Sequence, residues 1–547
     1  MTDKHNNELV LLGVGTFGTV WQKTNGDALK ISRHLICENW YSDIDFIKDI
    51  ICLRTLQKIS FVPELRDVRL DKKLSFSMNC YKCTLHDILT QKTNQFNIQE
   101  VINNLDVIIF KLVFTLACGQ KNYIIHRDIK PGNILITDNY DIVLTDWGMS
   151  IINFSKYVYS NKSRVVQTLW YRSPEHLINI FDYMNNNTID MWSIGIIMLE
   201  IIMKNGNGLM NVGQIIESDE TYKKIFEKMI QLFGIPKDKI MLKYITENKI
   251  QIEKYGACYI KNACNFANVS NDCINFIKTC LEYCPNERFT PIDALKHPYL
   301  IEHYVNHIDK NDNVYDFLWF SNADMKKNNI KSYSINMDLI NSINRYYHSL
   351  RSKFFLDYTE MTCNFYQLYA LCITFTDKYM EKNKVNDYDF NLSVAIYLIV
   401  MGFYSDDIEN IDEIIEGFSD DELNKHIVIG HIKNFFKSVD FDLQFKTLMT
   451  FDELFDNSHQ SIKFFYRRLA HDVIRNYKNV QYDCNELFYN ILIYMINFVH
   501  IDNNNKITYY KTELNYLIDK FKTKNIIQLK LNYNTIIVDD GKIKKQN

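Results

Sequence analysis

Four polar side chains in one short stretch of the chain combine two carboxylates, an amide and an amine. Asp128, Lys130 and Asn133 lie in the run HRDIKPGN (126–133), and Asp146 follows after a turn and an apolar, strand-like segment. One carboxylate can accept a hydroxyl proton, and the second carboxylate and the amide can hold Mg²⁺. An aspartate standing alone here would be an ordinary solvated loop residue. The complete set suits phosphoryl transfer, in which a lysine also offsets phosphate charge.

A glycine-rich segment near the N-terminus offers a place for phosphate groups. The sequence GVGTFGTV (13–20) stands between the apolar, strand-like runs 9–12 and 20–21. Glycines let backbone N–H groups approach phosphates closely, although they also form ordinary tight turns, so the pattern alone is weak. The residues expected to contact a nucleotide here are Gly13, Val14, Gly15, Thr16, Gly18 and Val20.

Lys30 is expected on the third strand of a small sheet. Asn25-Gly26 is a strong hairpin signal, and it places Ala28 and Lys30 on the strand after the turn. A lone lysine on a strand is by default solvated. With the glycine-rich segment before it and the aspartates after it, Lys30 is expected to face the α- and β-phosphates of a nucleotide.

Taken together, these motifs and their order resemble a eukaryotic-type protein kinase over residues 8 to about 302. The Lys-Pro-x-Asn form of the loop is similar to serine/threonine kinases. The segments VVQTLWYRSPE (165–175) and LFGIP (232–236) resemble cyclin-dependent kinases and their relatives. The resemblance implies an α+β, bilobal fold with a small β-rich N-lobe and a large helical C-lobe, and it implies ATP and Mg²⁺ as cofactors.

The resemblance also implies roles for single residues. Asp128 would accept the hydroxyl proton, and the hinge Asn79-Cys80-Tyr81 would bind the adenine base through its backbone. Trp147 stands where relatives usually have Phe. The catalytic residues implied are Asp128, Lys130, Lys30 and Asp49, the metal ligands are Asn133 and Asp146, and further nucleotide contacts are Ala28, Met78 and Cys80.

Two further motifs carry expectations about support for the site. DMWSIG (190–195) is similar to the buried helix of the family whose aspartate, here Asp190, supports the catalytic loop. NERFT (286–290) matches the last helix of the lobe, so Arg288 is expected to pair with Glu175.

The acidic partner of Lys30 departs from the family pattern. Relatives have a glutamate on the helix after the third strand, and alignment of IKDIICL (47–53) places Asp49 there. Aspartate is one methylene shorter, so the helix must approach more closely and the ion pair is expected to be weaker or conditional. Glu38 is an alternative that precedes the apolar helical run.

The anchors for a phosphorylated activation segment are incomplete. Arg127 is present, but Lys48 and Ile151 occupy positions where relatives tend to have arginines. Lysine lacks the bidentate fork of arginine, and isoleucine has no charge. Ser163 lies where the family's activating phosphothreonine falls, and it is a candidate switch, although loop serines are common.

Two smaller patterns bear on regulation and redox chemistry. Thr16 corresponds to one inhibitory phosphorylation position of cyclin-dependent kinases, whereas the neighbouring tyrosine is Phe17 here. Cys80 and Cys83 form a C-x-x-C pair, but no second pair stands at zinc spacing, so packing is the better interpretation.

Composition indicates a folded protein of a reducing compartment. A hydrophobic fraction of 47% favours folded domains over disorder, and a net charge of −4 gives no reason to expect a nucleic-acid or membrane partner. The 13 cysteines lack a disulfide spacing and the N-terminus is polar, so an intracellular site, cytoplasm or nucleus, is expected. Abundant Asn, Ile, Lys and Tyr suggest an A+T-rich genome, such as that of a large DNA virus or a protist.

The pattern changes after the last kinase-like motif. We expect a kinase domain at 1–305, a polar and turn-rich linker at 306–335, and an α-helical domain at 336–547. A closing hairpin is predicted at 526–538, with a frayed lysine-rich end from Lys542. Apolar residues recur at helical spacing in 365–379, 391–404, 428–437, 460–476 and 486–500.

The second domain resembles a cyclin box in part. The similarity covers 368–380 and 391–407, with TDKY (376–379) in place of Asp-Arg-Phe, whereas the lysine of the box falls at Phe403. Such a module could press the Asp49 helix inward, an intramolecular regulation. An unrelated helical bundle is the alternative.

The sequence favours a serine/threonine protein kinase that acts on protein hydroxyls, with Ser-Pro or Thr-Pro targets preferred. The alternative is a pseudokinase scaffold that binds partners through its helical domain. Retention of Lys30, Asp128, Asn133 and Asp146 favours catalysis, because a scaffold has no chemical need for all four.

Overall fold

A computed structural model describes most of the first 310 residues and parts of the remainder. Contacts divide the chain into two compact units, Met1–Ile152 with Lys162–Phe320, and Asn153–Asn161 with Ser321–Asn547. The described residues are 9–36, 40–137, 139–152, 167–180, 187–213, 217–250, 259–266, 269–310, 329–330, 371–372, 374–376, 378–380, 382–383, 390–404, 423–443, 466, 470, 482–483, 491–492, 495, 536–539 and 542–545.

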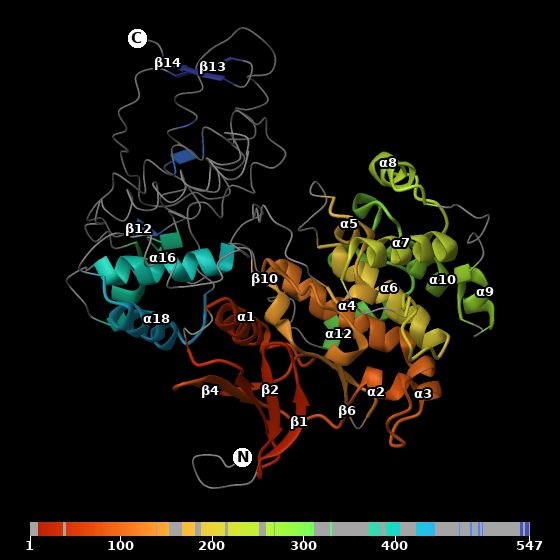
Figure 1. Cartoon of the computed structure of the whole chain (residues 1–547), viewed down its shortest axis with the longest axis horizontal. Coiled ribbons are helices and arrows are strands. Elements are labelled where there is room, and N and C mark those ends of the chain that lie inside the picture. The colour runs from red at the N-terminus through yellow and green to blue at the C-terminus, as the bar shows by residue number, and fades with distance from the viewer. Residues whose placement is uncertain are drawn as a thin grey trace. The chain divides into compact units, whose positions relative to one another are not determined.

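The first unit begins with an antiparallel sheet in the strand order β1-β2-β3-β5-β4 (Figure 1). The Asn-Gly hairpin is confirmed: Gly26 has φ 88°, and Lys23 N–H donates to Asp27 O at 2.8 Å. The register places Val20 opposite Lys30 and Ala28 opposite Met78, so these four residues share one face of the sheet. The strands are β1 (Val10–Val14), β2 (Gly18–Gln22), β3 (Ala28–Ser32), β4 (Leu65–Leu70) and β5 (Leu74–Met78).

Helix α1 (Trp40–Leu56) lies beside this sheet and carries Asp49. It is buried around its whole circumference, by apolar residues such as Ile44, Ile50 and Leu53 and by charged ones such as Asp45 and Lys48, each at most 3% exposed. A helix buried on all faces packs against its surroundings on all faces. The helix is therefore fixed by apolar packing, and Phe46 on it contacts Phe76 of β5 edge-to-face at 5.3 Å.

The larger part of the first unit is helical (Figure 1). Short strands position its loops: β6 (Cys83–Thr84), β8 (Ile134–Ile136) and β9 (Ile142–Leu144) form one sheet, and β7 (Ile124–Ile125) pairs with β10 (Ile151–Ile152). The helices are α2 (Leu85–Leu89), α3 (Ile98–Asn103), α4 (Leu105–Lys121), α5 (Pro174–Leu177), α6 (Ile189–Ile202), α7 (Asp219–Phe233), α8 (Lys239–Glu247), α9 (Tyr259–Phe266), α10 (Asn271–Cys280), α11 (Pro291–Ala294) and α12 (Ile301–Lys310).

Helix α6 is the centre of this lobe, because all its residues are buried. The predicted pair is confirmed next to it: Arg288 donates to both oxygens of Glu175 at 2.9 and 2.6 Å. The guanidinium also lies 5.4 Å from the centre of the Trp192 ring of α6. Together with the sheet, these elements confirm the predicted bilobal fold.

The end of the first unit differs from the sequence expectation. Residues 306–310 were expected to be turn-rich linker, but they form the last part of α12. His307 explains the difference, since its ring packs against Phe110 and Phe114 of α4 at 5.6 and 4.7 Å. His303 Nε2 adds a hydrogen bond to Asp106 Oδ2 at 2.8 Å. Tertiary contacts on one face of the helix thus outweigh a polar composition.

The second unit contains further helices. α16 (Phe390–Tyr404) and α18 (Lys425–Val439) confirm the predictions at 391–404 and 428–437, while the predicted helices at 365–379, 460–476 and 486–500 lie largely outside the described residues. Strand β11 (Asn329–Ile330) pairs with β12 (Tyr482–Asp483).

Most of the predicted hairpin at 526–538 lies outside the described residues, and two described strands pair further along the chain. β13 (Ile536–Asp539) pairs with β14 (Lys542–Lys545), so the lysine-rich segment belongs to a strand and the expectation of a frayed end was wrong. Backbone pairing with β13 supplies the hydrogen bonds that composition does not reveal.

Candidate active site

The loop that carries Asp128 is held by a buried carboxylate. Asp190 accepts the backbone N–H groups of His126 and Arg127 at 2.9 Å each, as the sequence predicts. Burial raises the pKa of Asp190 to about 7, although the two donated hydrogen bonds act to lower it. Arg127 has a left-handed backbone (φ 63°), a conformation that these two hydrogen bonds help to hold.

Asp128 is the centre of a hydrogen-bonded cluster. Its Oδ2 accepts from Lys130 Nζ at 2.6 Å and from Asn133 Nδ2 at 3.1 Å. Its Oδ1 accepts from the hydroxyl and the backbone N–H of Thr168 at 2.8 and 3.1 Å. Thr168 was not among the predicted site residues. Its position inside the motif VVQTLWYRSPE was the signal that could have identified it.

His126 orients the same loop and stays neutral. Its Nδ1 accepts the backbone N–H of Asp128 at 3.1 Å, which leaves Nε2 as the protonated nitrogen facing Thr145 O at 3.2 Å. Burial lowers the pKa of His126 to about 4, despite the nearby charge of Asp128. The imidazole is therefore a fixed support for the loop at neutral pH.

Lys30 of β3 lies between two carboxylates. Its Nζ is 2.7 Å from Asp49 Oδ2 of α1 and 2.7 Å from Asp146 Oδ1. Burial alone would lower the pKa of Lys30, but the two carboxylates raise it above its usual value. Burial raises the pKa of Asp49, whereas for Asp146 Lys30 outweighs burial and lowers it. The ammonium is charged, and Asp146 is ionised.

The glycine-rich segment folds toward these groups. Gly18 has no room for a Cβ, because that atom would collide with the backbone carbonyl of Ile31. Gly13 has nothing within 4 Å of the position of a Cβ, so the space beside its backbone is open. Phe17 is 7% exposed, and its ring contacts Gly148.

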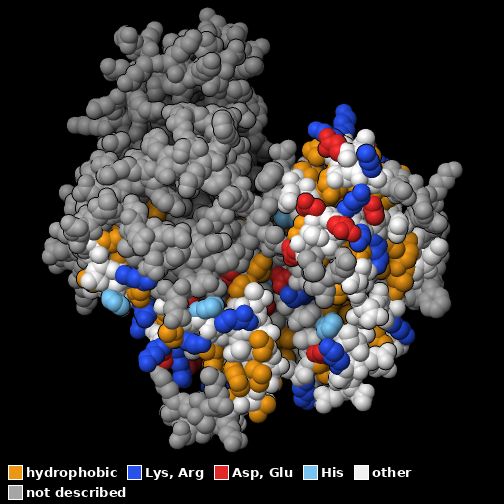
Figure 2. All heavy atoms as spheres, in the orientation of Figure 1, with side chains coloured by type: hydrophobic (Ala, Val, Ile, Leu, Met, Phe, Trp, Pro, Cys, Tyr) orange, Lys and Arg blue, Asp and Glu red, His pale blue; other side chains and the backbone are white. Residues whose placement is uncertain are grey.

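Strand β1, which runs into this segment, exposes apolar side chains at the surface. Val10, Leu11, Leu12 and Val14 are 46–67% exposed, and Figure 2 shows hydrophobic side chains at this end of the sheet. Thr16 is also exposed, and Gly15 N–H donates to Gly18 O at 2.8 Å, which closes the turn.

The residues expected around the base lie on the common face of the sheet or beside it. Ala28 and Met78 are 3% and 7% exposed. Cys80 follows β5 and is half-buried, and burial raises the pKa of its thiol.

The donor set of Asn133 and Asp146 fits Mg²⁺. Asn133 uses Nδ2 for both of its donated bonds, to Asp128 O and Oδ2, so its carbonyl oxygen is the side-chain atom that can bind a cation. Among the described residues no three His, Cys, Asp or Glu side chains form a metal cluster. Mg²⁺ typically binds few protein oxygens together with substrate phosphates, which agrees with this arrangement.

The other predicted positions have different outcomes. Ile151 lies in β10, paired with Ile125 and 4% exposed, and Lys48 is 2% exposed with Asp45 Oδ1 3.8 Å away. Arg127 Nε donates to Met149 O at 2.8 Å. Ser163 and Glu38 lie outside the described residues.

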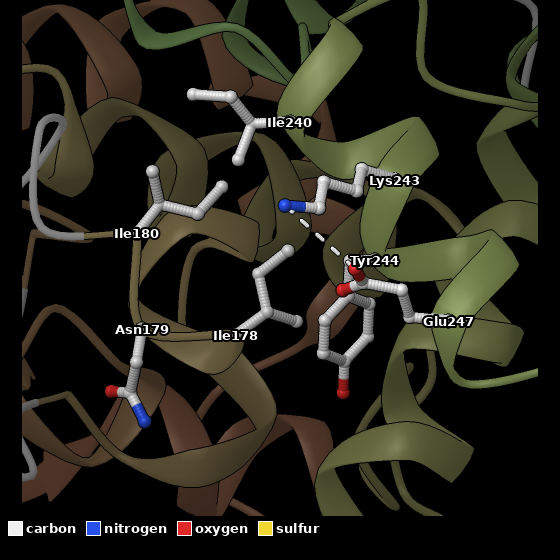
Figure 3. A pocket seen from close by; sticks show the side chains of 7 residues that line it. All are labelled: Ile178, Asn179, Ile180, Ile240, Lys243, Tyr244 and Glu247. Carbon is white, nitrogen blue, oxygen red and sulfur yellow. Dashed lines mark ion pairs between the residues drawn. The ribbon is translucent and has the colours of Figure 1, made fainter.

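A separate pocket of about 340 Å³ lies between the end of α5 and helix α8 (Figure 3). Ile178, Ile180 and Ile240 line it, together with Asn179, Tyr244 and the ion pair Lys243–Glu247 at 3.7 Å. None of the groups described above lines this pocket, so it is not part of the candidate active site. In the described residues no helix is long and apolar enough to cross a bilayer.

Comparisons with known proteins agree with this geometry. The family described as "Protein kinase domain" matches residues 7–300. Mitogen-activated protein kinase pmk-3 of Caenorhabditis elegans is 28% identical over 226 residues, which are 40% of this chain and 45% of that protein. Cyclin-dependent kinase 7 of Dictyostelium discoideum is 29% identical over 317 residues, 54% of this chain and 79% of that protein. Mitogen-activated protein kinase 6 of Arabidopsis thaliana is 25% identical, over 55% of this chain and 74% of that protein. The chain therefore spans less than half of the first relative and most of the other two.

Proposed function

The chain belongs to the protein kinase family, and on this premise we propose that residues 1–305 transfer the γ-phosphate of ATP to serine and threonine hydroxyls of proteins. The observation that carries the proposal is two polar contacts, Lys30 with Asp146 and Asn133 with Asp128. A backbone hydrogen bond from Thr145 N–H to Asn133 O at 3.0 Å brings the segments of the two pairs together. Lys30 Nζ is 2.7 Å from Asp146, and Asn133 Nδ2 is 3.1 Å from Asp128.

Asp128 would act as the base in this reaction. The substrate hydroxyl oxygen bonds to the γ-phosphorus, the bond from that phosphorus to the leaving ADP oxygen breaks, and Asp128 takes the hydroxyl proton. Thr168 and Asn133 aim the carboxylate through their hydrogen bonds, and Lys130 places a positive charge beside it. Such orientation is a large part of what a kinase contributes.

The remaining groups would hold the nucleotide. Lys30 offers its ammonium to phosphate oxygens while Asp49 fixes its position. Asn133 and Asp146 would hold Mg²⁺, which supplies charge neutralisation on the phosphates when bound. The open backbone at Gly13 and the apolar face formed by Val20, Ala28 and Met78 would receive the phosphates and the base.

The backbone at Gln167 supports a preference for Ser-Pro and Thr-Pro targets. Gln167 has a left-handed backbone with φ 63°, and its carbonyl oxygen accepts from Arg172 at 3.0 Å. It directly precedes Thr168, which contacts Asp128. The Gln167 carbonyl is therefore already hydrogen-bonded at the place where the substrate residue after the phosphorylated serine or threonine would pass. Proline has no backbone N–H, so it leaves no unpaired hydrogen-bond donor at this position, whereas any other residue would.

We also propose that the C-terminal helices regulate the kinase, in a manner similar to cyclins. The burial of α1 on all its faces supports this idea, because the position of Asp49 depends on where that helix lies. Phe403, at the position of the cyclin-box lysine, is 4% exposed. Comparing the intact chain with one ending at Lys310 tests the proposal, since undiminished turnover in the shorter chain would contradict it.

Phosphate incorporation tests the catalytic proposal. The intact protein is expected to label a generic protein substrate with Mg-ATP, and Asp146→Ala is expected to abolish labelling. Asp67→Ala is the matched control, because its side chain is 45% exposed on β4 and lies 2.7 Å from the nearby Arg69 Nε. Equal silence of the intact protein and Asp146→Ala would favour the pseudokinase scaffold.

A further inference from the structure

Asp49 makes two contacts with two different parts of the site. Its Oδ2 accepts from Lys30 Nζ at 2.7 Å, and its Oδ1 accepts the backbone N–H of Trp147 at 2.9 Å. Trp147 directly follows Asp146, and it begins the 3₁₀ turn η2 (Trp147–Met149). One carboxylate on α1 therefore ties together the strand lysine and the segment that carries the expected metal ligand.

The packing around Asp49 leaves little room for a longer side chain at this position. The residue is 2% exposed, and its neighbours Phe46 and Phe76 are each 1% exposed. A Cβ on Gly148 would lie 3.2 Å from Asp45 O of α1 and 3.0 Å from the Phe17 ring. Helix α1, the turn η2 and the glycine-rich segment thus meet at van der Waals distance.

A longer acid cannot be added here without a shift of one of these parts. Glutamate adds one methylene, which is about 1.5 Å of bond length. In a close-packed interior that insertion forces side chains off their rotamers or moves the backbone. Moving α1 outward would let the longer side chain keep its contacts with Lys30 and Trp147, but it would open the close packing between α1 and the turn η2.

Resting on the kinase activity proposed above, we propose that Asp49 is a positioning residue whose short side chain sets the spacing between α1 and the Asp146-Trp147-Gly148 turn. Aspartate is then the residue that fits this site, and glutamate, the residue of the family pattern, impairs it. This reverses the sequence expectation of a weakened, conditional pair.

Two substitutions separate the two contacts. Asp49→Glu keeps a charge for Lys30 but cannot keep both of its bonds together with the present packing of α1 against η2. We therefore expect kcat to fall at least about tenfold, because small misplacements in active sites have effects of this size. Asp49→Asn keeps an oxygen for Trp147 N–H but cannot accept from Lys30, so the KM for ATP is expected to rise with a smaller change in kcat. Asp219→Glu adds the same methylene on the exposed first turn of α7 and is expected to leave both parameters unchanged.

The outcome is decisive in either direction. Turnover by Asp49→Glu equal to or above that of the unsubstituted chain overturns the proposal, because a simple ion-pair partner would tolerate the longer acid. If Asp49→Glu does not fold, Asp49→Asn decides: a kcat as low as that of Asp49→Ala would overturn a role for the Trp147 contact.

The proposal can fail separately from the kinase function. If the intact chain transfers no phosphate, the kinase function fails, and binding of fluorescent ATP with and without Mg²⁺ tests Asp49 alone. The Asp49→Glu chain is then expected to bind ATP at least about tenfold more weakly than the unsubstituted chain when Mg²⁺ is present. Unchanged affinity would overturn the proposal about Asp49.

Discussion

Arg288 and Glu175 form a bidentate ion pair between residues 113 positions apart in sequence, and both side chains have 0% exposure. Burial alone would raise the pKa of Glu175, but Arg288 lowers it. The guanidinium also donates to the carbonyls of Glu282, Tyr283 and Thr188. One side chain thus joins the segment before α6 to the last helices of the lobe.

Removing one partner of this pair is expected to destabilise the lobe strongly. Arg288→Met leaves Glu175 buried without its counter-charge, which typically costs roughly 3–5 kcal/mol of unfolding free energy. The double variant Glu175→Leu with Arg288→Met is expected to recover part of this loss, because no buried charge remains. Denaturant unfolding of the single and double variants measures the coupling. A double variant as unstable as the sum of both singles would contradict this account.

Thr168 is expected to affect catalysis more than ATP binding. Its hydroxyl donates to Asp128 at 2.8 Å and lies 3.0 Å from Lys130 Nζ. Thr168→Val keeps the shape but loses the hydroxyl, so kcat is expected to fall by about 10- to 100-fold with little change in the KM for ATP. Thr168→Ser is the control, since it retains the hydroxyl. Equal losses in both variants would contradict this role, because Thr168→Ser retains the hydroxyl.

Peptide substrates test the role of Gln167. Its side chain bonds Ser193 Oγ at 3.1 Å and Ser173 N at 2.9 Å, which fixes the left-handed backbone. Peptides with proline after the phosphorylated serine are expected to react about 5- to 150-fold faster than peptides with alanine, because a backbone N–H without a hydrogen-bond acceptor costs about 1–3 kcal/mol. N-methylalanine is expected to resemble proline. A rate for N-methylalanine equal to that for alanine would show that the ring, not the missing N–H, is recognised.

Gln167→Gly is the matching variant on the enzyme side. Glycine adopts positive and negative φ readily, so the carbonyl is free to turn toward the substrate. The ratio of proline to alanine rates is expected to fall toward one. A retained ratio would place the selectivity elsewhere in the groove.

His176 is expected to make stability depend on pH. Burial lowers its pKa to about 4, whereas an unfolded histidine titrates near 6.5. Between these values the unfolded chain binds more protons, so the contribution of His176 is lost as the pH falls from 6.5 to 4, by roughly 3 kcal/mol at most. Burial raises the pKa of Glu200 to about 7, which acts in the opposite direction over the same range.

The difference between two chains isolates the histidine. His176→Asn can keep a partner for Ser173 Oγ, which lies 3.1 Å from His176 Nδ1, but it does not titrate. The stability advantage of the unsubstituted chain over His176→Asn is therefore expected to shrink as the pH is lowered from 7 to 4. A constant difference would contradict the assignment.

Short sequence patterns predicted the elements that are set by interactions between residues close together in the sequence. The Asn-Gly turn, the strand of Lys30, and helices α16 and α18 follow from turn chemistry and from apolar periodicity, which act over a few residues. The predicted end of the kinase domain shows the limit, because α12 continues through a polar segment that His307 anchors to α4.

The sequence alone determined which side chains are available for chemistry, namely Asp128, Lys130, Asn133 and Asp146 in one short stretch and Lys30 far before it. Only the tertiary structure decided how they are connected. Thr168 reaches Asp128 across 40 positions, and Asp49 reaches Trp147 across 98. Such contacts depend on how helix, strand and turn pack together. Differences of a few tenths of an ångström in packing distance are not encoded in the spacing of any motif.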